Sequence, residues 1–208
     1  MYKGERFNSI SHLLGAVMAF VGLVVLLVFA SLRGDPWRIV SYSIYGVSLV
    51  LLYLASALYH SFQKETTKAF FQRLDHQAIY VLIAGTYTPF SLVTLRGAWG
   101  WSLFGVVWGL AGCGLVVDAL PSTRKSRRFV PLAIYLIMGW LCVFALGPLL
   151  ERLPATGFLL LLSGGVLYTA GIGFYLFDRR VRHFHGIWHL FVLAGSLCHY
   201  FAILLYLE

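Results

Sequence analysis

The chain has 208 residues, of which 60% are hydrophobic and only 12% are charged, and its mean hydropathy is +0.81. A soluble globular domain carries about a quarter charged residues and under half apolar ones, so this composition excludes a soluble protein. The net charge of +8 would suggest a nucleic-acid partner in a soluble chain. Here the charges stand in short connections between apolar stretches, where they orient a protein in the bilayer. We therefore expect an integral membrane protein without a nucleic-acid partner.

Seven apolar stretches follow one another, and charged residues within them are limited to an aspartate at one end of two stretches. They cover about residues 11–32, 39–62, 75–95, 97–118, 129–150, 153–177 and 183–207. A helix needs about 20 residues to cross the hydrocarbon layer, and each stretch is of that length. The chain is thus predicted to be an all-α membrane protein, with residues 1–208 forming a single bundle of seven transmembrane helices.

The distribution of Lys and Arg predicts the orientation of this bundle. With the N-terminus inside, 12 of the 16 basic residues face the cytoplasm: Lys3, Arg6, Lys64, Lys68, Arg73, Arg124, Lys125, Arg127, Arg128, Arg179, Arg180 and Arg182. The other four are Arg33, Arg38, Arg96 and Arg152. A three-to-one bias in short loops favours the side with more positive charge as the cytoplasmic side. We expect a cytoplasmic N-terminus and an external C-terminus.

Two pairs of polar side chains stand four residues apart inside predicted spans. Ser56 and His60 form one pair in the second helix, and His185 and His189 form the other in the seventh. Residues four apart share one helix face, and ionisable groups within a span usually face the bundle interior. A single histidine at a span end is more often an interfacial or hydrogen-bonded residue than a metal ligand. Each pair alone is therefore weak evidence for a metal.

The topology brings these pairs to one depth. His60 ends the second helix, Asp75 begins the third, and His185 and His189 begin the seventh. An even-numbered helix ends, and an odd-numbered helix begins, at the same membrane face. Three imidazoles and one carboxylate at one depth resemble a catalytic zinc site, where three protein ligands leave a position for water. We expect a zinc ion on His60, His185 and His189, near the cytoplasmic side.

Other polar residues near this depth are candidates for acting on the metal-bound water. Zinc lowers the pKa of such a water to roughly 7. Asp75 could orient or deprotonate this water, and Ser56 could hydrogen-bond it. His12 and His76 are candidates for supporting the ligands. His199 lies too far along the seventh helix to reach the site.

Together these motifs resemble the progestin and adipoQ receptor family, in its prokaryotic hemolysin III branch. The resemblance lies in the Ser56-x3-His60 motif, Asp75 within RLDHQAIYVLIAGTYTPF, the His185-x3-His189 motif and the opening ERFNSISHLLG. It covers nearly the whole chain. It implies a seven-helix fold, zinc on the three histidines, and Asp75 and Ser56 acting on the metal-bound water. The wider superfamily consists of membrane hydrolases and includes alkaline ceramidases.

The resemblance also bears on localisation and partners. The animal receptors of the family carry a long cytoplasmic region before the first span, whereas this chain has about ten residues there. We therefore expect a multi-pass protein of the bacterial inner membrane rather than a hormone receptor. Its expected partners are membrane lipids, as substrate or as fatty-acid product.

Three functions are compatible with these features. The first is a zinc-dependent hydrolase of a lipid amide or ester bond, involved in membrane lipid homeostasis. The second is a non-enzymatic sensor or regulator of membrane lipids, in which zinc fastens helices together. The third, a pore-forming cytolysin, is the least favoured because the outer halves of most spans are apolar and lack a polar stripe. The substrate and the oligomeric state stay open.

Overall fold

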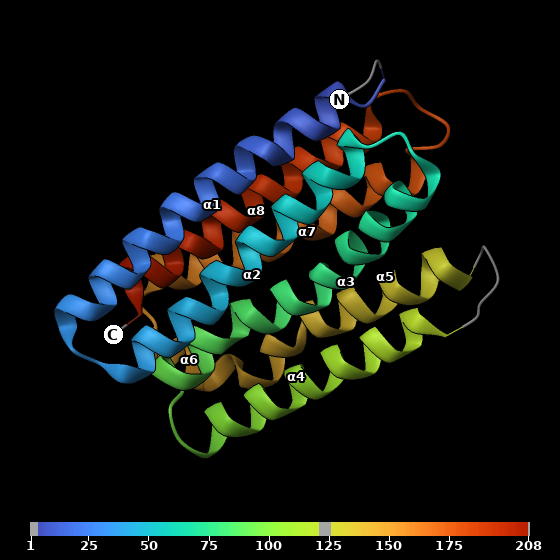
Figure 1. The fold of residues 1–208 in the computed structure, drawn as a ribbon. Coiled ribbons are helices and arrows are strands. Elements are labelled where there is room, and N and C mark those ends of the chain that lie inside the picture. Colours follow the sequence, from blue (N-terminus) through green and yellow to red (C-terminus); the bar gives the residue numbers. More distant parts are fainter. Residues whose placement is uncertain (1–3, 121–125, 208) are drawn as a thin grey trace.

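The computed structural model describes residues 4–120 and 126–207, and all regular structure in these ranges is helical (Figure 1). Lys3, Arg124 and Lys125, which were counted above as cytoplasmic charges, lie outside the described residues, as does the side chain of Arg127. The α-helices are α1 Arg6–Arg33, α2 Pro36–Ser61, α3 Glu65–Pro89, α4 Ala98–Ala119, α5 Ser126–Gly139, α6 Leu146–Arg152, α7 Ala155–Phe177 and α8 Phe184–Tyr206. A π-helical turn, Phe90–Thr94, follows α3, and a 3₁₀ turn, Leu141–Ala145, separates α5 from α6.

Six helical segments in the described ranges are long and apolar enough to cross a membrane. They are Arg6–Arg33, Pro36–Ser61, Ala98–Ala119, Arg128–Arg152, Ala155–Phe177 and Phe184–Tyr206. The prediction of an all-helical, multi-pass membrane protein is thereby confirmed. Helix α3 covers most of the remaining predicted span but begins ten residues earlier, at Glu65. Its first turns carry Lys68, Arg73 and Asp75, which lower its mean hydropathy below that of the other six.

The fifth predicted span consists of three helical pieces. Pro148 lacks a backbone N–H, and its ring clashes with the carbonyl four residues earlier, so a regular α-helix cannot run through this region without a break. The Tyr87 hydroxyl of α3 satisfies the broken backbone, donating to the Gly139 carbonyl and accepting from the Cys142 N–H, both at 2.9 Å. The break is therefore held by a neighbouring helix, as backbone in a membrane requires.

The packing of the helices places three chain segments together at one end of the bundle. Helix α1 packs against α2 and α8, α7 packs against α8, and α3 packs against α2, α4 and α5. The beginning of α1, the end of α2 and the beginning of α8 lie at the same end, whereas α8 finishes at the opposite end (Figure 1). Large apolar side chains such as Phe20, Leu32 and Phe144 point outward and are more than half exposed. Such extensive apolar surface is what a lipid-facing exterior requires.

Replacing Tyr87 by phenylalanine tests how the fifth span is held. The change removes the partner of the Gly139 carbonyl and of the Cys142 N–H. The bilayer offers no water in its place, so we expect a loss of about 1–2 kcal/mol of stability. The matched control is Tyr80→Phe, because the buried Tyr80 hydroxyl has no hydrogen-bond partner in the described structure. Thermal unfolding in detergent should show a lower Tm for Tyr87→Phe and little change for Tyr80→Phe. Equal effects of the two changes would contradict the assignment.

Candidate metal centre

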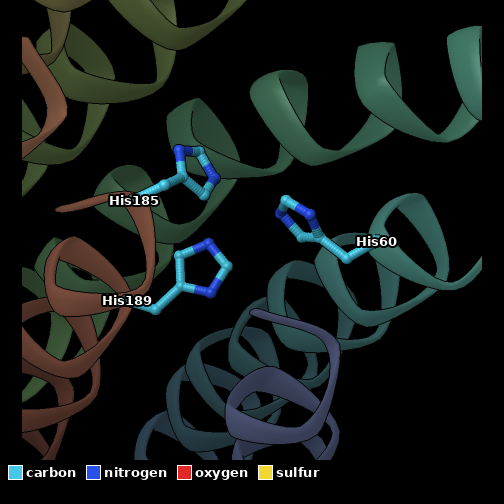
Figure 2. Close-up of side chains that lie close together, drawn as sticks. All are labelled: His60, His185 and His189. Carbon is cyan, nitrogen blue, oxygen red and sulfur yellow. The ribbon is translucent and has the colours of Figure 1, made fainter. Parts of the chain in front are cut away.

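Three histidine rings converge where α2 ends and α8 begins. Figure 2 shows His60 pointing from α2 toward His185 and His189, which lie on successive turns of α8. One ring nitrogen from each histidine lies within 4.8 Å of the other two. The ring centroids are 4.8 to 5.1 Å apart. The structure therefore brings together the three residues that the span order had placed at one depth.

Carboxylates hold two of these rings through their Nδ1 atoms. His60 Nδ1 lies 2.7 Å from Glu5 Oε2, and His185 Nδ1 lies 2.9 Å from Asp178 Oδ2. An ionised carboxylate only accepts hydrogen bonds, so the proton of each interaction sits on Nδ1. In the neutral ring this leaves a lone pair on Nε2, the state in which imidazole binds a metal.

A hydroxyl group holds the third ring in the same way. Ser11 Oγ donates its proton to the Asn8 carbonyl at 3.0 Å and lies 3.3 Å from His189 Nδ1. Because a hydroxyl has a single proton, Ser11 accepts from His189 rather than donating to it. Nδ1 of His189 therefore carries the proton, and its Nε2 has the free lone pair.

The three Nε2 atoms are buried and have no hydrogen-bond partner among the described residues. Leaving a buried polar atom unpaired costs about 1–3 kcal/mol, and here three such atoms face one another. A shared divalent cation would satisfy all three lone pairs at once. Three imidazole ligands, each with its other nitrogen donating to a protein acceptor, are the donor set typical of zinc. The residues therefore fit the metal that the sequence predicted.

Glu5 is a second residue in contact with the candidate ligand His60. In the sequence it was noted only as part of the opening motif. It also accepts from Asn8 Nδ2 at 2.7 Å and pairs with Lys68 Nζ at 3.3 Å. Burial would raise the pKa of this carboxyl, but hydrogen bonds from His60 and Asn8 and the charge of Lys68 outweigh it and lower the pKa to about 2. Glu5 is therefore ionised at neutral pH, as an acceptor from His60 must be.

Asp178, between α7 and α8, is a second partner that the sequence analysis missed. Arg128 Nη2 donates to Asp178 Oδ1 at 2.8 Å and also to the Tyr175 carbonyl, and the guanidinium lies over the Tyr175 ring. Burial opposes ionisation of Asp178, yet hydrogen bonds from His185 and Arg128 lower its pKa. No motif spacing marked this residue, because its partner His185 lies across an irregular turn.

The two predicted catalytic residues lie close to the histidine cluster. Asp75 of α3 is 7% exposed and lines the cavity that also contains His60 and His185. Ser56 lies one helical turn before His60, and its buried hydroxyl has no partner in the part of the chain that the structure describes. Asp75 thus lies on the wall of a cavity that a small molecule could enter, with the Ser56 hydroxyl close to it.

The two predicted supporting histidines take different positions. The His12 ring stacks on His189, with centroids 3.6 Å apart and planes 15° from parallel, and its edge contacts Tyr53. His12 therefore contacts the ring of the candidate ligand His189 by stacking. His76 lines the same cavity as Asp75, and its backbone carbonyl accepts from the Tyr135 hydroxyl at 2.8 Å.

Two cavities of different character meet at Asp75. A polar cavity of about 980 Å³ opens at the metal-site end of the bundle, and its lining includes Glu5, His60, Asp75, His76, Asp178 and His185. An apolar cavity of about 150 Å³ lies deeper in the bundle, and its lining includes His12, Asp75, Leu82, Tyr135, Trp188 and Val192. Asp75 and Trp188 line both cavities. His60 and His185 thus line a polar cavity that shares Asp75 and Trp188 with an apolar one.

The fold and this site define an all-helical membrane protein with a buried cluster of three histidines. A family model described as "Haemolysin-III related" matches residues 1–200. Hemolysin-3 of Bacillus cereus and the Hemolysin-3 homolog of Bacillus subtilis (strain 168) are each 45% identical over 206 residues, covering 98% of this chain and 92% and 94% of theirs. Heptahelical transmembrane protein 1 of Arabidopsis thaliana is 28% identical over 241 residues, covering all of this chain and 70% of that protein. The chain belongs to the hemolysin III family, as its motifs predicted.

Metal analysis of purified protein tests the ligand assignment. We expect about one zinc ion per chain in the wild type and almost none in His60→Ala or His189→Ala, because two imidazoles hold zinc far less tightly than three. His183→Ala is the matched control: His183 lies two residues before His185 and is exposed. Retention of metal by both ligand variants would contradict the site.

The carboxylate partners should tune metal affinity without supplying ligands. In Glu5→Gln and Asp178→Asn the Nδ1 acceptor becomes neutral, and we expect zinc affinity to fall about 10- to 100-fold. Competition with a chromogenic chelator measures this, with the exposed Glu65 changed to Gln as the control. Unchanged affinity in both variants would show that these carboxylates do not support the metal.

Proposed function

We propose that this hemolysin III family protein is a zinc-dependent hydrolase that cleaves an amide or ester bond of a membrane lipid. The observation that carries the proposal is the position of Asp75, at the junction of the polar cavity beside the histidines and the apolar cavity in the bundle. A lipid has the same two-part character, with a polar carbonyl region joined to an apolar chain. Its scissile bond would lie at the junction, with its chain in the apolar cavity.

The proposal includes seven spans and a site near the cytoplasm. Helix α3 is 25 residues long and packs between α2, α4 and α5, which supports its crossing the membrane with them. The name of the Arabidopsis relative, Heptahelical transmembrane protein 1, also describes seven helices. The excess of Lys and Arg at the histidine end supports placing that end, with the N-terminus, in the cytoplasm.

The chain's own residues have separate tasks in this reaction. His60, His185 and His189 would hold zinc through Nε2, while their Nδ1 partners fix the rings. Zinc, when bound, supplies Lewis-acid chemistry and lowers the pKa of a coordinated water to roughly 7. Asp75 accepts a proton from the attacking water and delivers it to the leaving group.

The bonds broken and formed in the reaction are those of a simple hydrolysis. The bond between the carbonyl carbon and the leaving nitrogen or oxygen (sulfur in an acyl-CoA) breaks, and the water oxygen forms the new bond to that carbon. The products are a fatty acid and an amine or alcohol (a thiol from an acyl-CoA), and no oxidant or reductant is needed. The Ser56 hydroxyl, one turn from His60, is free to hydrogen-bond the water or the substrate carbonyl.

A sensor with structural zinc is the second candidate, and the helix arrangement favours it. The ligands and their partners come from the start of α1, the end of α2, the α7–α8 turn and α8. A metal would therefore fasten segments far apart in the chain. Pore formation, the third candidate, is supported less, because apolar side chains line most of the inner cavity.

The change Asp75→Asn separates these functions. For a hydrolase we expect turnover to fall at least about 100-fold, because proton transfer is lost, while zinc content stays near one per chain. The substrates to test are ceramides, acyl-CoAs and phospholipids. Asp118→Asn is the matched control, since Asp118 lines the same polar cavity.

Two outcomes would contradict catalysis. One is full turnover by the Asp75→Asn variant. The other is a zinc-loaded wild type that cleaves none of the three substrate classes. A structural role predicts instead that Asp75→Asn behaves as the wild type and that His60→Ala lowers the Tm sharply.

A further inference from the structure

Three arginines that have no task in the proposed reaction line the polar cavity. They are Arg73 of α3 and Arg179 and Arg182 of the segment between α7 and α8. All three are exposed, whereas Asp75, on the wall of the same cavity, is buried. These residues, the cavity-mouth arginines, therefore lie toward the open end of the cavity, and Asp75 lies toward its inner end.

Most other charges on this cavity wall are paired within the protein. Arg128 pairs with Asp178 at 2.8 Å. Glu5, which accepts from His60, pairs with Lys68 at 3.3 Å. The cavity-mouth arginines form no ion pair with a carboxylate in the part of the chain that the structure describes. Their guanidinium groups can therefore bind a ligand without first breaking an ion pair of that kind.

The mouth of the cavity carries an excess of positive charge. Outside the pairs just described, Asp75 and Asp118 are the carboxylates of the described lining, and three arginines stand against them. A zinc ion on the histidines would add further positive charge. A cleft with an excess of one sign of charge attracts ligands of the opposite sign, so this cavity favours an anionic group.

The type of side chain and the size of the cavity indicate the kind of anion. A guanidinium group donates two parallel hydrogen bonds to neighbouring oxygens of a phosphate or carboxylate. A phosphate monoester has three acceptor oxygens and up to two negative charges, so it can engage more than one arginine. Ligand cavities measure about 300–1,000 Å³, and this one, at about 980 Å³, has room for a phosphorylated head group.

We propose that the polar part of the lipid substrate carries a phosphate group, which the cavity-mouth arginines bind. This inference rests on the proposed function, which places the scissile carbonyl at Asp75 and the acyl chain in the apolar cavity. The phosphate at the mouth and the chain in the bundle then hold the carbonyl between them from both sides. The leaving group is a phosphorylated alcohol, amine or thiol, and a neutral ceramide is a poor substrate.

Binding of two matched ether lipids to the zinc-loaded protein in a neutral detergent tests the proposal. Hexadecylglycerol phosphate and hexadecylglycerol differ by the phosphate alone, and their ether bond is not hydrolysed, so the measurement does not depend on turnover. We expect the phosphate-bearing lipid to bind at least about tenfold more tightly at low salt. The preference should decline as the salt concentration rises, because these arginines are exposed. Equal affinity of the two lipids would overturn the proposal.

The variants Arg73→Gln, Arg179→Gln and Arg182→Gln assign the preference to the cavity-mouth arginines. Each should weaken binding of the phosphate-bearing lipid several-fold, with unchanged affinity for the neutral lipid and unchanged zinc content. The matched controls are Arg180→Gln and Lys64→Gln, because both residues are exposed at the same end of the bundle and do not line the cavity.

Two outcomes of this comparison would overturn the assignment. A full preference in all three cavity variants would show that the phosphate binds elsewhere, for example to the zinc ion. An equal loss in the two control variants would show a general attraction to the positive surface at this end of the bundle. The expected result is a loss in the cavity variants and full binding in the controls.

Competition with inorganic phosphate separates a lipid head group from free phosphate. We expect displacement of hexadecylglycerol phosphate only when inorganic phosphate is present in at least about 100-fold excess, because burial of the alkyl chain supplies much of the lipid's affinity. Displacement at equal concentrations would assign the arginines to free phosphate and overturn the lipid assignment.

Turnover measurements keep this inference separate from the proposed function. For a hydrolase we expect palmitoylglycerol phosphate to have a lower KM than palmitoylglycerol, and Arg73→Gln to raise that KM with little change in kcat. A phosphate preference that the arginine variants lose, in a protein that cleaves no lipid, supports the phosphate site and counts against the hydrolase. Faster cleavage of ceramide than of the phosphate ester would support the hydrolase and overturn the phosphate site.

Discussion

The pairing of each Nδ1 atom of His60, His185 and His189 with a protein acceptor is the interaction on which the rest of the site depends. Glu5, Asp178 and Ser11 take the three Nδ1 protons and leave three buried Nε2 lone pairs facing one another. One nitrogen of each ring lies within 4.8 Å of the others, and three unpaired buried acceptors in one cluster are unfavourable unless a cation joins them. The same contacts join the start of α1, the end of α2 and the α7–α8 turn. They therefore determine both the geometry of the site and the packing of the helices at this end of the bundle.

The junction at Asp75 connects this site with its surroundings. The polar cavity is lined by His60 and His185, whereas the cavity on the other side of Asp75 has a mostly apolar lining, which suits a hydrocarbon chain. A hydrolase of membrane lipids has to bring water and an apolar substrate to one carbonyl group. A polar and an apolar cavity that share Asp75 and Trp188 would suit such a reaction.

Much of the site could be predicted, because the face on which a helical residue lies depends only on its spacing from its neighbours, and successive spans cross the membrane in alternating directions. Four-residue spacing puts His185 and His189 on one face of α8, and the order of the spans brings His60 and Asp75 to the same end. The contacts of Glu5 and Asp178 could not be predicted, because they depend on how a helix start and an irregular turn fold against a helix end. His12 was predicted to support the ligands, and its stacking on His189 depends on the packing of α1 on α8, which the sequence does not give.

The sequence by itself determined the membrane class, the helical architecture, the family and the three histidines of the candidate centre. Composition and period-3.6 spacing are properties of neighbouring residues, and a bilayer leaves helices as nearly the sole solution for apolar stretches of this length. The tertiary structure alone decided which nitrogen of each histidine is free and where the polar and apolar cavities meet. These features depend on side-chain contacts between distant helices, down to the tenths of an ångström that separate a hydrogen bond from a gap, and spacing along the chain carries no such information.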